Sequence, residues 1–254
     1  MSGEPIRVFW QPGCSSCVKV KEFLSTRGVY FISIDVLQGG DALAQLEALG
    51  AQSIPIVARG NSFVFAQSLP QVAEFLGLTM DAPKRLPADV LMTRWTYFLE
   101  AAYAATAQIP PRHLAFRPVP ERDRSARALA YHVFQVPEAF IATVVDGLEY
   151  WTIIANEPAP KTIQNVDDIL AYAQQMTARL QQWWHELDDK TCQWPVKTFY
   201  GEQPVVELLE RQTWHSAQHA RQLQTVLETF QVPLIQTIKA SAYEGLPMPA
   251  GLWD

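Results

Sequence analysis

Two cysteines with redox spacing are the first residues of this chain whose types could do chemistry. Cys14 and Cys17 are separated by two residues and directly follow a β-type run at residues 6–10. At the start of a helix, the Cys14 sulfur meets unpaired N–H groups and the helix dipole, which favour a thiolate and lower the thiol pKa. We therefore predict Cys14 as the nucleophile and Cys17 as the resolving thiol. The alternatives are an inert pair or a zinc site, which would need a second ligand pair nearby, and the third cysteine, Cys192, is far away.

A second candidate site comes from three histidines on inward-facing helical stripes. One stripe follows steps of four and three residues: Leu208, Gln212, His215, His219, Gln222 and Val226. A similar series on another segment, Ser125, Leu129, His132, Val136 and Ala139, turns His132 inward. Residues one turn apart project to the same side of a helix, so the three imidazoles can converge. Buried ring nitrogens need partners, and one divalent metal ion can serve all three. For each histidine alone, a hydrogen-bonded core residue is the alternative.

The remaining residues of this kind have structural interpretations. His113 lies in a proline-bounded loop and His185 near a helix end, so we expect both on the solvated surface. Cys192 follows the third long helical segment, where a buried cysteine acts as a small hydrophobe. The pair Trp183 and Trp184 indicates core and groove packing rather than a ligand box.

Short alternating elements must position the cysteines. Helical periodicity and β-type alternation predict, in order, a strand at 6–10, a helix at 18–27, a strand at 30–36, a helix at 41–49, β runs at 53–57 and 61–67, and a helix at 70–76. Pro55 lies at the mouth of a β run, which suits a strand start or a cis turn. The fold class predicted for residues 1–78 is therefore α/β.

Long helices must position the histidines. Residues 79–88 are polar, contain two prolines and predict a linker. After it, four amphipathic patterns cover residues 89–107, 124–147, 166–187 and 204–230, and we expect no strand among them. Proline-containing loops at 109–120, 156–160 and 194–203 separate the helices. The prediction for residues 89–254 is an all-α four-helix bundle followed by a C-terminal tail.

Composition and charge limit the classes of function. The chain has 254 residues, 48% of them hydrophobic, without an apolar run long enough to span a bilayer, so we expect a soluble protein with two cores. A net charge of −6 gives no reason to expect nucleic acid as a partner. The first residues show no signal-peptide pattern, and three cysteines suit a reducing compartment, which predicts a cytoplasmic location and no membrane partner.

The order of strand, C-x-x-C, helix and downstream x-Pro in residues 6–78 resembles a glutaredoxin. The resemblance implies a small thioredoxin-like domain in which Cys14 attacks disulfides and a cis Ile54–Pro55 bond helps to bind the thiol. Two elements differ from the family pattern. Ser15 and Ser16 replace the usual proline and tyrosine between the cysteines, and 66–68 reads Ala-Gln-Ser where a Gly-Gly-Asp-like element is usual.

Residues 88 to 238 resemble the DinB superfamily of metal-binding four-helix bundles. The resemblance is carried by Leu-Ala-Tyr-His at 129–132 and Trp-His-Ser-Ala-Gln-His at 214–219. It implies that His132, His215 and His219 form a facial site for zinc, with nickel or iron as alternatives, and that water or substrate takes the open positions.

Members of that superfamily include transferases and isomerases that use a low-molecular-weight thiol. The resemblance thus implies a metal-dependent and thiol-dependent transferase or isomerase, with glutathione or another small thiol as cofactor and an electrophile or disulfide as substrate. In this hypothesis the cysteine pair reduces or recycles the thiol adduct. The alternatives are a plain thiol-disulfide oxidoreductase whose bundle is a docking module, and a redox-sensing interaction protein. A homo-oligomer is compatible with each.

Overall fold

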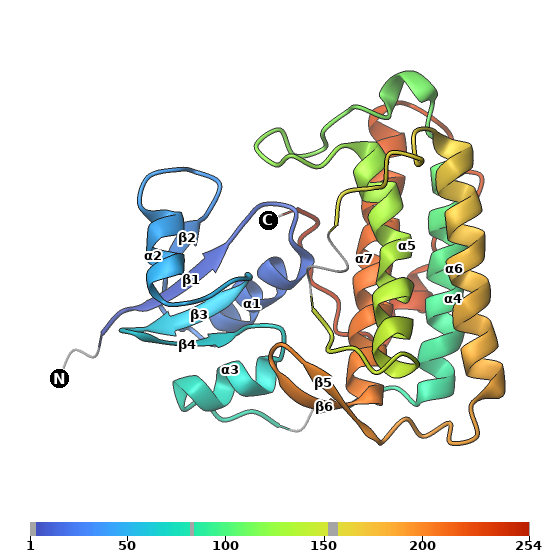
Figure 1. The fold of residues 1–254 in the computed structure, drawn as a ribbon. Helices are drawn as coiled ribbons and strands as arrows, with labels where there is room; N and C mark the ends of the chain where they lie inside the picture. The colour runs from blue at the N-terminus through green and yellow to red at the C-terminus, as the bar shows by residue number, and fades with distance from the viewer. Residues whose placement is uncertain (1–3, 82–83, 152–156, 254) are drawn as a thin grey trace. The chain divides into compact units, whose positions relative to one another are not determined.

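The computed structural model describes residues 4–81, 84–151 and 157–253 (Figure 1). Within these residues the chain forms two compact units. The first contains the N-terminal residues to 81 together with two short segments, 119–122 and 249–253. The second contains residues 84–118, 123–151 and 157–248.

The first unit is a four-stranded mixed sheet with helices, which confirms the predicted α/β, thioredoxin-like class (Figure 1). The strand order is β2-β1-β3-β4, with β1 parallel to β2 and antiparallel to β3. The strands are β1 (Ile6–Trp10), β2 (Ile32–Asp35), β3 (Ile56–Arg59) and β4 (Ser62–Phe65). The helices are α1 (Ser15–Thr26), α2 (Ala42–Ala48) and α3 (Leu69–Leu76).

Alternation along β1 builds a core on each face of the sheet. Val8 packs with Phe23 and Leu24 of α1 and with residues of α3. Its neighbour Phe9 points to the other face and packs with Leu46 of α2. Successive strand residues face opposite sides, so β1 is held between two helical layers. The loop after β1, which leads to Cys14 and the start of α1, is therefore attached to a central strand.

The second unit contains four long helices, as predicted (Figure 1). They are α4 (Ala88–Ala107), α5 (Ala126–Val144), α6 (Val166–Glu186) and α7 (Val205–Thr229). Their core includes Trp95 of α4 and Phe140 of α5, whose rings meet edge to face at 5.2 Å. Asn165 and Asp168 start α6 with a capping box, in which each side chain accepts a hydrogen bond from the backbone of the other.

The prediction of a loop without strands at residues 194–203 was wrong. The strands β5 (Pro195–Thr198) and β6 (Gly201–Pro204) form an antiparallel hairpin in this region. Both strands are four residues long and mostly polar, and the two residues between them are Phe199 and Tyr200 rather than the Asn-Gly or Asp-Gly pair that marks a hairpin in a sequence. The Thr198 hydroxyl donates to the Gly201 carbonyl at 2.5 Å and thereby ties the turn.

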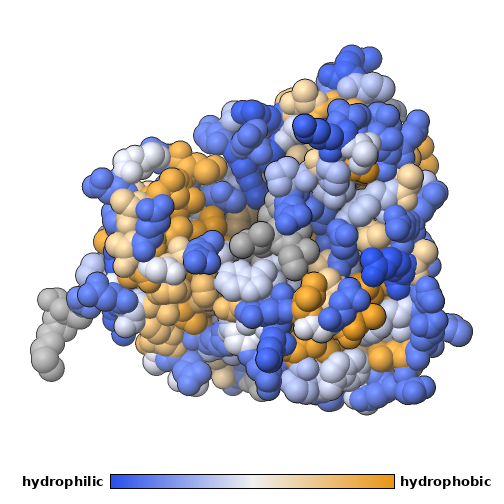
Figure 2. Space-filling view, in the orientation of Figure 1, coloured by the Kyte–Doolittle hydropathy of each residue, from blue (hydrophilic) through white to orange (hydrophobic). Residues whose placement is uncertain are grey.

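Hydrophobic residues reach the surface of the first unit (Figure 2). Among them, Ile32, Leu37 and Leu43 are 42%, 39% and 53% exposed. Because β2 ends the strand order, Ile32 lies at an open edge of the sheet.

Parts of the predicted organisation fall outside the described residues. These are residues 82–83 of the predicted linker and residue 156 of the predicted 156–160 loop. The domain limits at 78 and 89 stay predictions. Within the described part of the chain, none of the helices combines the length and the apolar character that a membrane crossing requires.

Candidate redox motif and candidate metal centre

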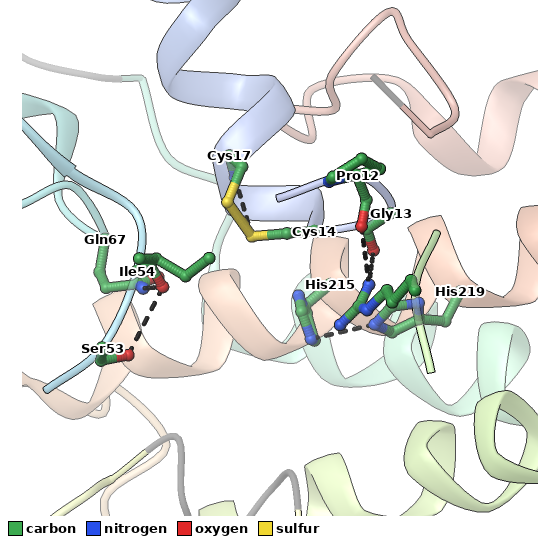
Figure 3. The surroundings of a disulfide bond; sticks show 10 residues. Pro12, Gly13, Cys14, Cys17, Ser53, Ile54, Gln67, His215 and His219 are labelled. Carbon is green, nitrogen blue, oxygen red and sulfur yellow. Dashed lines mark hydrogen bonds between the residues drawn. A yellow bond between two sulfur atoms is a disulfide. The ribbon is translucent and has the colours of Figure 1, made fainter. Parts of the chain in front are cut away.

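The two cysteines lie at the start of α1, where the spacing predicted them. Cys14 is the N-cap residue, and its sulfur accepts a hydrogen bond from the backbone N–H of Cys17 at 3.3 Å. The helix therefore begins earlier than the predicted residue 18. The sulfurs form a disulfide, with the two Cα atoms 5.2 Å apart (Figure 3).

Burial distinguishes the two sulfurs. Cys14 is partly exposed, whereas Cys17 is fully buried. In the reduced form, a sulfur that caps a helix N-terminus is stabilised as a thiolate, because it faces the positive end of the dipole. The geometry suits Cys14 as the attacking sulfur and Cys17 as the sulfur that closes the disulfide.

The second predicted part of the redox site is the loop before β3. The Ile54–Pro55 peptide bond is cis, as the family resemblance implied. The Ile54 carbonyl accepts hydrogen bonds from the Gln67 amide at 3.3 Å and from the Ser53 hydroxyl at 3.5 Å (Figure 3). Gln67 belongs to the Ala-Gln-Ser stretch that replaces the usual family element, so this sequence difference places an amide against the cis-proline loop. Thiol binding by Ile54 and Pro55 stays a prediction.

Sequence reasoning missed the residues that hold the loop before Cys14. The Gly13 N–H donates to the Trp253 carbonyl at 2.6 Å. Arg122 donates from Nη1 to the Gly13 carbonyl and, at 3.4 Å, to the Pro12 carbonyl. Local periodicity in a sequence cannot reveal these contacts, because they join residues more than one hundred positions apart.

The three predicted histidines converge inside the second unit. His132 comes from α5, and His215 and His219 come from α7. One ring nitrogen from each lies within 4.8 Å of those of the other two. His132 and His219 are 3% and 1% exposed, whereas His215 is partly exposed. The Nε2 atoms of His215 and His219 are 3.1 Å apart (Figure 3).

A buried amide orients one of these rings. His219 Nδ1 lies 2.6 Å from Oε1 of Gln222, which is one turn further along α7 and 1% exposed. An amide oxygen only accepts, so Nδ1 carries the proton and Nε2 presents a lone pair toward His215. Gln222 was predicted on the inward stripe of this helix, but its contact with His219 was not predicted.

The donor set fits a divalent metal ion. Imidazole nitrogen suits zinc, nickel and iron, and bonds of about 2.0–2.1 Å to one ion can span two nitrogens that are 3.1 Å apart. Three protein ligands leave further coordination positions open, as in catalytic rather than structural zinc sites. The assignment of the three histidines as ligands stays a prediction.

A polar layer lies one turn before His215 on α7. Arg211 is 6% exposed and donates to the Tyr150 hydroxyl at 2.9 Å and to the Gln212 side-chain oxygen at 3.2 Å. Burial raises the pKa of nearby Tyr200 to about 12, so this phenol keeps its proton at neutral pH. Gln212 was on the predicted stripe, but nothing in the local pattern identified Arg211 or Tyr150.

The other two histidines lie apart from the triad. His185 is exposed, as predicted. His113 is only partly exposed, and its ring stacks on Phe230 with the centroids 4.0 Å apart. The prediction that His113 is a solvated surface residue is therefore corrected, because one face of its ring is covered by Phe230.

Cys192 and the tryptophan pair have the structural environments that were predicted. Cys192 is fully buried, and burial raises its thiol pKa to about 11. The Trp183 ring packs edge to face on Phe140 at 5.0 Å, and the Lys190 ammonium lies 4.7 Å from the Trp184 ring centroid.

Family models match both parts of the chain. The glutaredoxin model matches residues 6–64, and the DinB superfamily model matches residues 94–223, about half of the chain. The second range contains all three histidines of the candidate metal centre.

Individual relatives cover smaller shares. The Gene 56 protein of Mycobacterium phage L5 is 35% identical over 54 residues, which are 21% of this chain and 52% of that protein. The Gene 56 protein of Mycobacterium phage D29 is 32% identical over 54 residues, or 21% of this chain and 60% of that protein. The chain thus spans only a little over half the length of these curated relatives. A crystal structure of a DinB-like protein from Bacillus cereus ATCC 10987 aligns with a TM-score of 0.48 and 16% identity, over 58% of this chain and 95% of that one.

Proposed function

We propose, from the premise that this chain belongs to the DinB superfamily and carries an N-terminal glutaredoxin domain, that it is a metal-dependent transferase or isomerase that uses a small thiol. The glutaredoxin domain supplies thiol-disulfide exchange. The reaction class is nucleophilic. The sulfur of the thiol forms a bond to an electrophilic carbon, the displaced group leaves with the bonding electrons, and the thiol proton passes to solvent.

The observation that carries this proposal is the convergence of His132, His215 and His219 with a buried amide behind them. A bound divalent ion lowers the pKa of a coordinated thiol, so that a thiolate exists at neutral pH. The protein's own part is to present three nitrogen donors in a fixed orientation. Gln222 contributes by fixing the proton of His219 on Nδ1. Zinc is the first candidate, and nickel and iron are the alternatives.

The cysteine pair would return oxidised thiol to the reaction. The Cys14 thiolate attacks the disulfide of a small thiol, forms a mixed disulfide and releases one thiolate. Cys17 then attacks the Cys14 sulfur and releases the second thiolate, leaving the Cys14–Cys17 disulfide seen in the structure. Two electrons pass from the protein dithiol to the small disulfide. Glutathione is the first thiol to test.

Single-residue variants of the full chain separate the two activities. Purified wild type, Cys14→Ser, His215→Ala and, as a control, His185→Ala are analysed for metal content. They are then assayed for reduction of a small disulfide and for transfer of glutathione and other small thiols to an activated aryl chloride. His185 is exposed and lies apart from the triad, so His185→Ala shows whether the loss of any histidine changes metal content or activity.

We expect one divalent ion per chain in every protein except His215→Ala, which should lose both the metal and thiol transfer while keeping disulfide reduction. Cys14→Ser should show the reverse pattern. If His215→Ala retains its metal, the assignment of the site is wrong. If it loses metal but performs every thiol reaction, the bundle is a docking module and the transferase proposal fails. A response of partner binding to the redox state of Cys14, without either activity, would favour the redox-sensing alternative.

A further inference from the structure

The loop that precedes Cys14 is held by residues from two distant parts of the sequence, all within the first unit. Trp253 accepts a hydrogen bond from the Gly13 N–H through its carbonyl. Arg122 donates to the Pro12 and Gly13 carbonyls. The segment around Trp253 is fastened in turn, because the Ala250 and Gly251 N–H groups donate to the Glu22 carboxylate at 2.9 and 2.7 Å.

Gly13 permits the approach of the guanidinium. Its φ of +70° lies in the left-handed region, which other residues rarely adopt. A Cβ atom at this position would lie 2.9 Å from Nη1 of Arg122 and would displace it. Glycine at position 13 therefore permits both the left-handed backbone conformation and the approach of the Arg122 guanidinium to the Gly13 carbonyl.

The charge of Arg122 faces neutral backbone. Burial lowers its pKa to about 10, so the group stays protonated at neutral pH. Other charged groups near the motif have their own contacts. The Lys21 ammonium lies 3.3 Å from the Trp10 ring centroid, and Glu22 accepts from the C-terminal segment. Glu121, next to Arg122, is exposed.

We propose that Arg122 is a positioning residue of the redox motif, which stabilises the reduced form of the Cys14–Cys17 pair by holding a cation against the carbonyl of Gly13, the residue before Cys14. A neighbouring cation favours the thiolate over the thiol, and a stabilised reduced form raises the reduction potential of a dithiol pair. This inference rests on the proposed redox role of Cys14 and goes beyond it, because it names a residue outside the C-x-x-C segment.

The equilibrium to measure is exchange with glutathione. Two glutathione molecules give up one electron and one proton each and become one glutathione disulfide. The protein disulfide takes up the two electrons and the two protons and becomes two thiols, and Cys14 then releases a proton to solvent in proportion to its thiolate fraction. The protein dithiol-to-disulfide ratio in buffers of known glutathione composition gives the equilibrium constant directly.

Four full-chain variants test the proposal. Arg122→Met removes the charge and the hydrogen bonds. Arg122→Gln keeps an N–H donor without the charge, and Arg122→Lys keeps the charge. Arg117→Met is the matched control. Arg117 lies, like Arg122, in the segment between α4 and α5, is 53% exposed and pairs with exposed Asp123. After acid quenching, free thiols are labelled with a maleimide and counted by mass, and Cys192 adds a constant single label.

The expected result is a shift of the equilibrium toward the disulfide by about 3- to 10-fold in Arg122→Met and Arg122→Gln, which corresponds to about 15–30 mV. Arg122→Lys and Arg117→Met should stay within about twofold of wild type. If Arg122→Met does not fold, the comparison of the glutamine and lysine variants decides alone.

Three outcomes overturn the proposal. They are an equilibrium constant for Arg122→Gln equal to that of wild type, a shift in Arg122→Lys as large as that in Arg122→Gln, and a shift in Arg117→Met as large as either. A wild-type protein that does not exchange with glutathione or another small thiol refutes the proposed redox function instead, and this result is recognised before any variant is compared.

Discussion

Replacement of Gln222 by leucine should weaken metal binding without touching a ligand. The Gln222 Oε1 atom lies 2.6 Å from His219 Nδ1, and the amide is 1% exposed. Leucine has a similar size but cannot accept a hydrogen bond from the His219 Nδ1–H. In the variant His219 loses the contact that holds its Nε2 lone pair toward the other two histidines, so both its tautomer and its ring orientation become less defined.

The magnitude follows from the role of such partners in known metal sites. Loss of a hydrogen-bond partner behind a ligating histidine costs about 10- to 100-fold in metal affinity, or about 1.4–2.7 kcal/mol. The metal-free protein should also lose about 1–3 kcal/mol of unfolding free energy, because a buried N–H loses its acceptor. Gln222→Glu should bind metal at least as tightly as wild type, since a carboxylate accepts the same hydrogen bond from Nδ1–H and makes the imidazole a stronger donor to the metal.

The assay is competition for zinc or cobalt against a chromophoric chelator, together with denaturant unfolding of the metal-free proteins. Gln224→Leu is the matched control. Gln224 lies two positions further along α7, is 8% exposed and donates to the Gln236 carbonyl at 2.7 Å. It should lose stability but keep its metal affinity. A metal dissociation constant for Gln222→Leu within twofold of wild type would refute the reasoning, and so would an equal loss of affinity in Gln224→Leu.

Three further predictions concern other parts of the chain. Cys17→Ser should trap a mixed disulfide on Cys14. The rate of Cys14 alkylation, plotted against pH, should give an apparent pKa below the free-cysteine value of about 8.5, and an apparent pKa at that value contradicts the activated thiolate. Burial raises the pKa of Cys192 from 9.0 to about 11, so the folded state holds this proton more tightly, and the resulting stability is present below pH 9 and is lost as pH rises to 11. Between pH 9 and pH 11 the unfolding free energy of Cys192→Ala, measured with denaturant, should therefore fall less than that of wild type. An equal fall in the two proteins would contradict this prediction. Asn165→Ala removes the oxygen that accepts from the Asp168 N–H at 3.0 Å and should cost about 1 kcal/mol of unfolding free energy, whereas a loss below about 0.3 kcal/mol would show that the cap contributes little.

The long helices and the histidine triad could be predicted because one physical rule governs both. A helix that buries one side repeats its apolar residues every three to four positions, and any polar residue in that repeat is carried inward with them. His215 and His219 interrupt the repeat of α7, and His132 interrupts that of α5. Their convergence needed only the further condition that the two helices pack together.

The missed elements lack a repeat of this kind. The hairpin of β5 and β6 consists of two four-residue strands, and prolines occupy its outer ends at Pro195 and Pro204. Proline normally weakens a strand prediction, and it is tolerated here because it closes the hairpin at the position where the ladder ends. Two such short strands without a glycine-rich turn leave almost no local signal.

The contacts around Cys14 were missed for a different reason, and they bear on how the redox domain should be delimited. Local pattern assigns the motif, its helix and the cis-proline loop to residues 6–78, and it contains no information about which later segment returns to them. Arg122 and Trp253 are separated from Gly13 by more than one hundred residues, yet they bond to the carbonyl and the N–H of that one residue. A fragment that ends at residue 78 would keep both cysteines and lose both contacts. Its chemistry would therefore report on the C-x-x-C motif alone, and the activity of the full chain must be measured on the full chain.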